Sequence, residues 1–205
     1  AVSPDGSRIA YVLKDVHPAE RDERYRYGLM VVGGDHDPMA NAVGRRLLPL
    51  DEAAVRAPAW APDGRKIAFL RRAEGGPQVH GLDLASGACN VVTAAPHGVS
   101  SFDWHPDGHA LCYVAPVSSD REEDGELAEG RFRVIRRLAY KADGVGYWDH
   151  SWNHVFVSEL PAHGAAPRTP RRVSEGRFDH VAATWSPDGA RIAWLTSGDA
   201  HPDTT

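Results

Sequence analysis

Cysteine is scarce in this chain: its 205 residues include only Cys89 and Cys112. Two cysteines do not indicate the disulfide-rich scaffold of a small secreted protein. Cys112 occupies a position at which three related segments have alanine, so we expect a buried thiol that acts as a small hydrophobic residue. A disulfide between Cys89 and Cys112 is the alternative.

Long apolar runs and an excess of positive charge are also lacking. No segment approaches the ~18 apolar residues of a membrane span, and the chain does not open with the basic and then apolar segments of a signal peptide. Lysine and arginine number 23 against 28 acidic residues, a formal net charge of -5. These features argue against a membrane and against nucleic acid as partners. We expect a cytoplasmic protein and, since the chain starts inside a repeat, residues that precede Ala1.

What the chain does contain is a repeated motif, in which tryptophan and one further residue precede Pro-Asp-Gly. Complete copies occupy residues 60–64, 104–108 and 185–189, and residues 3–6 form a copy without the tryptophan. Proline suits the first corner of a turn, aspartate accepts hydrogen bonds from nearby backbone amides, and glycine adopts positive φ. Each copy therefore predicts a tight turn. The motif residues are Pro4, Asp5, Gly6, Trp60, Pro62, Asp63, Gly64, Trp104, Pro106, Asp107, Gly108, Trp185, Pro187, Asp188 and Gly189.

The four residues that lie three to six positions after each motif glycine also repeat. They are aliphatic, small, aromatic and aliphatic in turn. A run this short and apolar predicts a strand, and since positions of both parities are apolar, both faces of the strand should pack against other sheets. Sheets that are stacked in this way and built from a repeated hairpin indicate a β-propeller. The four runs are Ile9, Ala10, Tyr11, Val12; Ile67, Ala68, Phe69, Leu70; Leu111, Cys112, Tyr113, Val114; and Ile192, Ala193, Trp194, Leu195.

The spacing of the motif predicts one all-β domain (1–205), an incomplete propeller of about three to four blades of four-stranded antiparallel sheet. Pro62 and Pro106 are 44 residues apart, a normal blade period, whereas Pro106 and Pro187 are 81 apart. We interpret the excess as an insertion between the second and third strands of the third blade, with an acidic loop (119–130) and an excursion (131–152). The predicted units are a partial first blade (1–50), a second blade (51–94), a third blade with the insertion (99–174) and a partial fourth blade (178–205).

The insertion carries the most specific resemblance. Residues 137–147, which read Arg-Leu-Ala-Tyr-Lys-Ala-Asp-Gly-Val-Gly-Tyr, followed by His-Val-Phe-Val at 154–157, resemble the propeller insertion of the prolyl oligopeptidase family, in its acylaminoacyl-peptidase-like branch. Residues 22–32 and 102–104 are also similar to that branch. The repeats themselves are TolB-like. The likeness covers nearly the whole chain.

The resemblance implies a function. Members of that family are serine peptidases, in which a propeller caps an α/β-hydrolase domain and limits access to its active site. The chain is therefore expected to gate the access of a peptide substrate and to dock to a hydrolase domain of the same protein, without a cofactor. The catalytic triad of the family lies in the hydrolase domain, and no position here matches it; residues 98–102 depart from the Gly-x-Ser-x-Gly pattern at Phe102. We expect this chain alone to be inactive. The alternative is a TolB-like propeller that binds a protein partner without catalysis.

Aromatic and basic residues of the insertion form a candidate surface for the hydrolase domain or for the substrate entrance. The alternative is that they pack the insertion against its own blade. The repeated tryptophans, by contrast, occupy one structural position, so we expect them to pack between blades rather than to stack on a ligand. The candidate surface consists of Arg136, Arg137, Tyr140, Tyr147, Trp148 and Trp152.

Eleven histidines invite a metal-site interpretation, which the spacing does not favour. In an extended segment His150 and His154 would lie ~13 Å apart, and the acidic residues of 120–126 lack the regular spacing of a calcium loop. Residues 35–37 are a short polar loop. No metal is expected. An open arc of blades does leave strand edges uncovered, so self-association through these edges is a further expectation.

Overall fold

The computed structural model of the protein describes residues 1–17, 24–33, 44–118, 141–142, 146–147, 151–161 and 165–196. All regular secondary structure in these ranges is β-strand. The strands are β1 (Arg8–His17), β2 (Arg24–Gly33), β3 (Arg45–Arg46), β4 (Val55–Trp60), β5 (Lys66–Ala73), β6 (Gly76–Asp83), β7 (Cys89–Val91), β8 (Ser101–Trp104), β9 (Ala110–Ser118), β10 (Lys141–Ala142), β11 (Gly146–Tyr147), β12 (Ser151–Glu159), β13 (Arg171–Arg172), β14 (His180–Trp185) and β15 (Ile192–Thr196).

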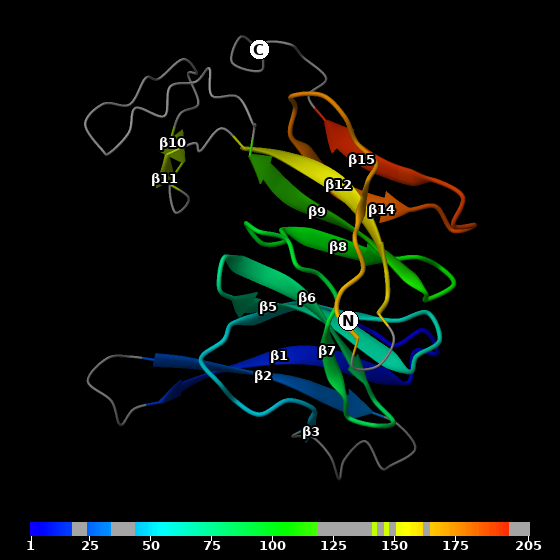
Figure 1. Cartoon of the computed structure of the whole chain (residues 1–205). Coiled ribbons are helices and arrows are strands. Elements are labelled where there is room, and N and C mark those ends of the chain that lie inside the picture. Colours follow the sequence, from blue (N-terminus) through cyan, green and yellow to red (C-terminus); the bar gives the residue numbers. More distant parts are fainter. Residues whose placement is uncertain are drawn as a thin grey trace.

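The strands form antiparallel sheets that follow one another along the chain. Blade 1 is the sheet β1-β2-β3, blade 2 is β4-β5-β6-β7, blade 3 is β8-β9-β12-β13, and blade 4 is the pair β14-β15. Figure 1 shows them stacked in sequence order, from blue blade 1 at one end to red β15 at the other. The prediction of an all-β, incomplete propeller is confirmed, with sheets that do not close into a ring.

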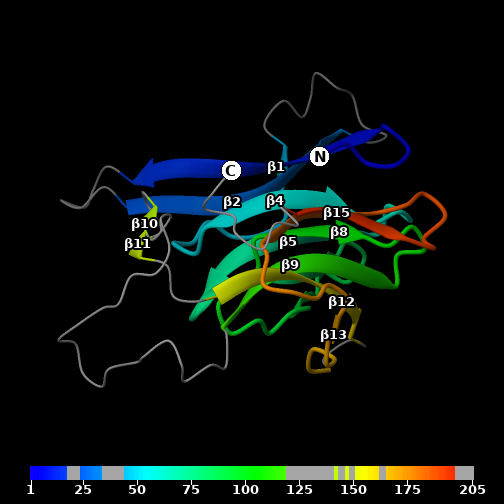
Figure 2. The same cartoon turned by 90° about the horizontal axis from the view of Figure 1, so that it is seen from above.

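The predicted insertion in the third blade is also present. Strands β9 and β12 are hydrogen bonded along their whole length, from Ala110 opposite Glu159 to Ser118 opposite Ser151, although residues 119–150 separate them in sequence. Within that segment the structure describes one short antiparallel pair, β10 with β11. The sheet of blade 3 is therefore continuous across this gap in the sequence, with β9 beside β12 (Figure 2).

The second strands of blades 2 and 3 are apolar on both faces, and each of these strands has a neighbouring blade on each side. In β5, Ile67 and Phe69 contribute to the core shared with blade 1, whereas Ala68 and Leu70 contribute to the core shared with blade 3. All four side chains are at most 1% exposed. Alternation along a strand sends successive side chains to opposite faces, so the repeated run supplies both cores at once.

The same positions of the repeated run face each other at each junction between adjacent blades. The small residue and the last aliphatic residue of one run pack on the first aliphatic and the aromatic residue of the next run. Each inter-blade core thus joins two unlike faces, which we call the small face (positions +4 and +6 after the motif glycine) and the large face (+3 and +5). The pairs are Ala10 and Val12 with Ile67 and Phe69; Ala68 and Leu70 with Leu111 and Tyr113; and Cys112 and Val114 with Ile192 and Trp194.

Cys112 is fully buried in the core between blades 3 and 4, as predicted, and both cysteines are free thiols. Burial raises the pKa of the Cys112 thiol to about 12. A thiol that stays protonated behaves as a hydrophobic side chain rather than as a nucleophile.

The first strands of blades 2 and 4 each contain a bulge at the same position. Ala57 and Ala182, both three residues before the motif tryptophan, have φ of 50° and 53°, and the strand register shifts across each of them. Strand β8 of blade 3 pairs regularly over the corresponding stretch, from Ser101 to Trp104. A left-handed alanine is unusual and strained, so its recurrence marks a local feature that blades 2 and 4 share.

Candidate functional site

Each Pro-Asp-Gly turn is closed in the same way. In all four copies the glycine N–H donates to the carbonyl three residues earlier at 2.9 Å, and the glycine φ lies between 66° and 75°. The aspartate side chain accepts a hydrogen bond from the backbone N–H two residues later, at 2.8 to 3.0 Å. These donors and acceptors are Ser7 to Asp5, Arg65 to Asp63, His109 to Asp107 and Ala190 to Asp188.

These hydrogen bonds stabilise the ionised form of three turn carboxylates, those of Asp5, Asp107 and Asp188. The Ser3 hydroxyl, followed by the N–H and hydroxyl of Ser7, lowers the pKa of Asp5 to about 2. The Ser186 hydroxyl likewise lowers the pKa of Asp188, and the backbone N–H of His109 lowers that of Asp107. Carboxylates held ionised and engaged by their own turns are structural groups, not general acids.

The motif tryptophans connect adjacent blades. Trp60 and Trp104 are each 7% exposed, and their indole N–H groups donate to backbone carbonyls of the preceding blade. The acceptors are Ala1, at 3.1 Å from Trp60, and Ala59, at 3.2 Å from Trp104. Each acceptor directly precedes the tryptophan position of its own blade, so the two contacts are equivalent.

Trp185 departs from this pattern. Its indole nitrogen is buried without a hydrogen-bond partner in the described part of the chain. Instead, the Asp103 carboxylate of blade 3 accepts hydrogen bonds from the Trp185 backbone N–H (3.0 Å) and from the Thr184 hydroxyl (2.7 Å). The side chain of Asp103 thus makes the polar link that a backbone carbonyl makes at the two earlier junctions.

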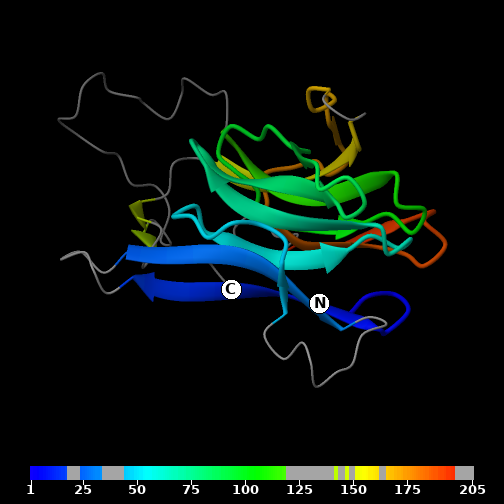
Figure 3. The same cartoon turned by 90° about the horizontal axis from the view of Figure 1, so that it is seen from below.

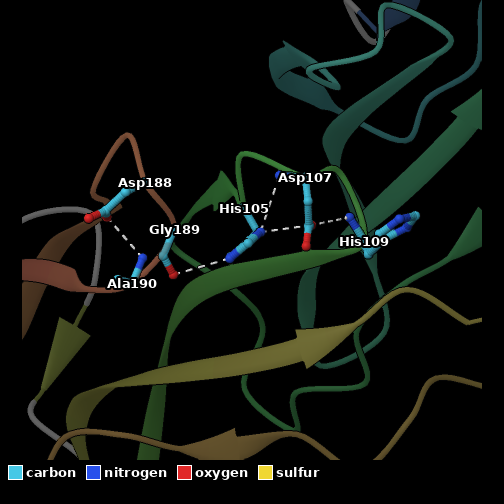
Figure 4. Close-up of polar contacts among 6 residues, drawn as sticks. All are labelled: His105, Asp107, His109, Asp188, Gly189 and Ala190. Atoms are coloured by element: carbon cyan, nitrogen blue, oxygen red, sulfur yellow. Dashed lines mark hydrogen bonds and ion pairs between the residues drawn. The ribbon is translucent and has the colours of Figure 1, made fainter.

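A second polar contact fixes the turn of the next blade. Arg8 lies over the Trp60 ring, 4.6 Å from its centroid, and donates to the Gly64 carbonyl at 3.1 Å. At the junction of blades 3 and 4, His105 Nε2 lies 3.2 Å from the Gly189 carbonyl (Figure 4). The His105 ring also meets that of Trp185 edge to face. Arg8 at the junction of blades 1 and 2, and His105 at the junction of blades 3 and 4, therefore each contact the carbonyl of the motif glycine in the next blade.

Two buried histidines, one from β12 and one from β14, face each other between blades 3 and 4. His154 and His180 are each 4% exposed, with ring centroids 5.3 Å apart. His154 Nδ1 lies 3.0 Å from the Ser174 hydroxyl, and His180 Nε2 lies 3.1 Å from the Glu175 carbonyl. Ser174 is itself buried and accepts the Val155 N–H, so this serine and histidine hold the strands together and cannot meet a substrate.

The structure describes only part of the candidate surface on the insertion. Trp152 lies in β12, half-buried and opposite Val117, and Tyr147 lies in β11. Arg136, Arg137, Tyr140 and Trp148 lie outside the described residues. The surface therefore stays a prediction. Across the described ranges there is no cluster of three or more histidine, cysteine or acidic side chains that could hold a metal, and no helix able to span a membrane.

No protein-family model matches the chain. A search of curated proteins finds the uncharacterized peptidase YuxL of Bacillus subtilis, 26% identical over 94% of this chain and 28% of its own length. It also finds dipeptidyl-peptidase 5 of Porphyromonas endodontalis, 28% identical over 78% of this chain and 22% of its own length. These relatives are peptidases. The chain spans less than a third of either one.

Solved structures agree on the fold. Pyrococcus horikoshii acylaminoacyl peptidase superposes with a TM-score of 0.57 over 94% of this chain and 30% of that chain, at 18% identity. A putative TolB from Agrobacterium tumefaciens gives a TM-score of 0.52 over 95% of this chain and 52% of that chain, at 15% identity. The resemblance predicted from the insertion and the TolB-like repeats is thus confirmed: this is a propeller region related to those of peptidases.

Sequence reasoning missed Asp103, His105 and the pair of His154 and His180. His105 occupies the variable position inside a motif copy, where the other copies have alanine or serine, and that difference was the available signal. No sequence signal could have revealed the histidine pair, because residues 154 and 180 become neighbours only when blade 4 stacks on blade 3.

The contrast between the tryptophans predicts different costs of losing an indole N–H. Trp104→Phe leaves the Ala59 carbonyl without its donor, whereas Trp185→Phe removes a buried group that has no partner. We expect Trp104→Phe to lower the free energy of unfolding by about 1–2 kcal/mol more than Trp185→Phe. Urea denaturation at equal m-value measures the difference, and Trp60→Phe should behave like Trp104→Phe. Equal losses for Trp104 and Trp185 would show that the indole hydrogen bonds are unimportant.

His154 and His80 predict weaker folding in mild acid. Burial, and then the charges of Arg172 and His180, lower the pKa of His154 below its usual 6.5. The folded state therefore favours the neutral ring; this stability is complete above pH 6.5 and is lost as pH falls through the lowered pKa. Burial lowers the pKa of His80 as well, so it contributes in the same direction.

We expect the urea midpoint to fall as the pH is lowered below about 6.5, and His154→Gln to make this fall shallower. The control is His109→Gln, on an exposed histidine, which should leave the slope unchanged. An unchanged slope in His154→Gln, with the native fold retained at pH 7, would show that His154 does not contribute.

Proposed function

We propose that this chain is the non-catalytic propeller portion of a serine peptidase of the acylaminoacyl-peptidase or oligopeptidase type. In this proposal it docks to an α/β-hydrolase domain of the same protein and limits which peptides reach the active site. The observation that carries the proposal is the similarity to a peptidase over 94% of the chain, confined to 28% of that relative. The rest of such a protein has ample length for a catalytic domain.

The described residues are consistent with a structural role. The motif aspartates are engaged by their own turns, the serine and histidine that approach each other at Ser174 and His154 are buried, and Cys112 is a protonated core thiol. Acyl transfer needs an accessible nucleophile beside a base. A gating role instead requires a rigid scaffold and an additional segment attached to it, and the sequence between β9 and β12 supplies the length of such a segment.

The geometry of blade 3 allows the insertion to be removed cleanly. Ser118 and Ser151 face each other at the end of the β9–β12 hairpin. A two-residue Asn-Gly turn can join directly opposed residues of an antiparallel pair. Replacing residues 119–150 by Asn-Gly should therefore leave the sheet of blade 3 intact.

In the complete protein, this deletion should raise kcat/KM for a long peptide relative to a dipeptide-sized substrate by roughly an order of magnitude. The control is Val91→Ser, on the exposed face of the outer strand β7, which should leave the ratio unchanged. An unchanged ratio in a folded, active deletion variant would contradict gating by the insertion.

The second candidate is a TolB-like propeller that binds a protein partner without catalysis. It is favoured by the superposition on the Agrobacterium TolB, of which this chain covers 52%. Labelling of the complete gene product by a fluorophosphonate, a reagent for activated serines, separates the two proposals. A labelled product with Gly-x-Ser-x-Gly beyond these blades supports the peptidase, and an unlabelled product made only of further repeats supports the binding module.

A further inference from the structure

Two buried histidines hold the segment that leads from blade 3 to blade 4. The rings of His154 in β12 and His180 in β14 lie 5.3 Å apart between centroids, and each residue is 4% exposed. His154 contacts Ser174 and His180 contacts the carbonyl of the next residue, so both rings bind the same stretch of chain. We propose that the pair is a pH-sensitive latch, which holds residues 174–179 on blade 3 while both rings are neutral and releases them when the pair takes up a proton.

Blade 2 has the same arrangement without a titratable group. In each of the two blades, the valine opposite the +6 residue donates its backbone N–H to a hydroxyl oxygen at 2.9 Å, and the residue before that valine contacts the same hydroxyl. This preceding residue is glutamine in blade 2 and histidine in blade 3. The equivalent residues are Val79 and Val155, Thr93 and Ser174, and Gln78 and His154.

The glutamine of blade 2 can keep its contacts at any pH. Gln78 accepts the Thr93 hydroxyl at 2.8 Å and the Ala95 N–H at 3.0 Å, and it donates to the Ala95 carbonyl at 2.7 Å. A side-chain amide is uncharged and offers a donor and an acceptor together. His154 holds the equivalent position through one ring nitrogen, whose role as donor or acceptor changes with protonation.

The contacts of both rings favour the neutral form. His180 Nε2 lies 3.1 Å from the Glu175 carbonyl, which can only accept, so Nε2 carries the hydrogen and Nδ1 carries the lone pair. That Nδ1 is buried without a partner in the described part of the chain, so a proton added there would be a buried donor without an acceptor. Ser174 accepts the Val155 N–H and can donate its hydroxyl to His154 Nδ1, which a protonated His154 could no longer accept.

The charges around the pair also disfavour a proton. Burial, and then the positive charges of Arg172 on β13 and of the second histidine, lower the pKa of His154 below its usual value. Asp179 acts in the opposite direction, but its carboxylate already accepts the backbone and side-chain N–H groups of Asn153, both at 3.0 Å. Glu175 is exposed and contributes its carbonyl. Three further neighbours carry no charge: Ala115 opposite His154, Thr196 opposite His180, and Trp194, whose ring meets that of His180 edge to face.

The latch lies close to the insertion. His154 is three residues after Ser151, the first residue of β12 beyond the insertion. In Figure 3 the yellow and gold β12 and β13 lie on the side of the stack away from blue blade 1. Release of residues 174–179 should therefore loosen blade 4 and this end of β12 while blades 1 and 2 stay packed. Such a latch is independent of a peptidase function.

Residue-resolved amide hydrogen exchange on the complete protein tests the latch, because blades 2 and 3 offer matched reporters. The Val155 N–H is held by Ser174 and the Val173 N–H by the Val155 carbonyl, and their equivalents in blade 2 are Val79 and Val92. After correction for intrinsic exchange, we expect the protection of Val155 and Val173 to fall below about pH 6.5, by up to about tenfold per pH unit. The fall at Val79 and Val92 should be smaller.

Two variants and a matched control assign the effect to the pair. His154→Gln recreates the arrangement of blade 2 and should make the fall at Val155 and Val173 shallower. His180→Gln keeps a donor for the Glu175 carbonyl and should act in the same direction. The control is His80→Gln, on the equivalent strand β6 of blade 2, which should leave the pH dependence at Val155 and Val173 unchanged.

Three results would overturn the latch. One is an equal pH dependence in the two groups of amides, which would mean that the whole stack loosens in acid. Another is a protection of Val155 and Val173 that does not change with pH. The third is an unchanged slope in a folded His154→Gln or His180→Gln variant. The first two results come from the natural sequence, so they decide the question even if a variant fails to fold.

Discussion

The structure depends on burying the second strands of blades 2 and 3 from both sides. A β-strand that is apolar on both faces cannot remain at the surface of a protein without exposing one of them. The side chains of Ile67, Ala68, Phe69 and Leu70 are each at most 1% exposed, because blade 1 covers one parity and blade 3 the other. No single sheet of this chain is a stable unit under this constraint, so the fold is a stack in which each blade requires its neighbours.

Polar contacts then orient the stack that the apolar residues drive together. The indole N–H of a motif tryptophan, the guanidinium of Arg8, the carboxylate of Asp103 and the ring of His105 all reach from one blade to the backbone of another. Hydrogen bonds of this kind add little net stability but penalise wrong alignments, because a misplaced buried donor is left without a partner. The junction of blades 3 and 4, which uses the carboxylate of Asp103 and contains the buried His154, is accordingly expected to respond to pH.

The fold was predictable because its determinants are local and repeated. Each Pro-Asp-Gly copy specifies a turn by its own chemistry, and the parity of the following run reveals a strand covered on both faces. The excess spacing after Pro106 located the insertion, and β9 and β12 do pair across it. The cross-blade contacts were not predictable, because the partner of Asp103 or His154 depends on how one blade rotates on the next, which no spacing along the chain records.

Function is less visible in the residues than fold, because a propeller contributes shape and contact surface rather than reactive groups. The relatives are peptidases, and in the proposed function the insertion is where gating would act.

All of these interpretations rest on one packing rule: the small face of each blade packs on the large face of the next blade. A double-mutant cycle measures that rule most directly. Leu70→Val and Leu111→Val, which share the core of blades 2 and 3, should be coupled by at least about 0.5 kcal/mol. Phe69→Leu and Leu111→Val lie in different cores and should be additive; coupling in this second pair, with additivity in the first, would contradict the account.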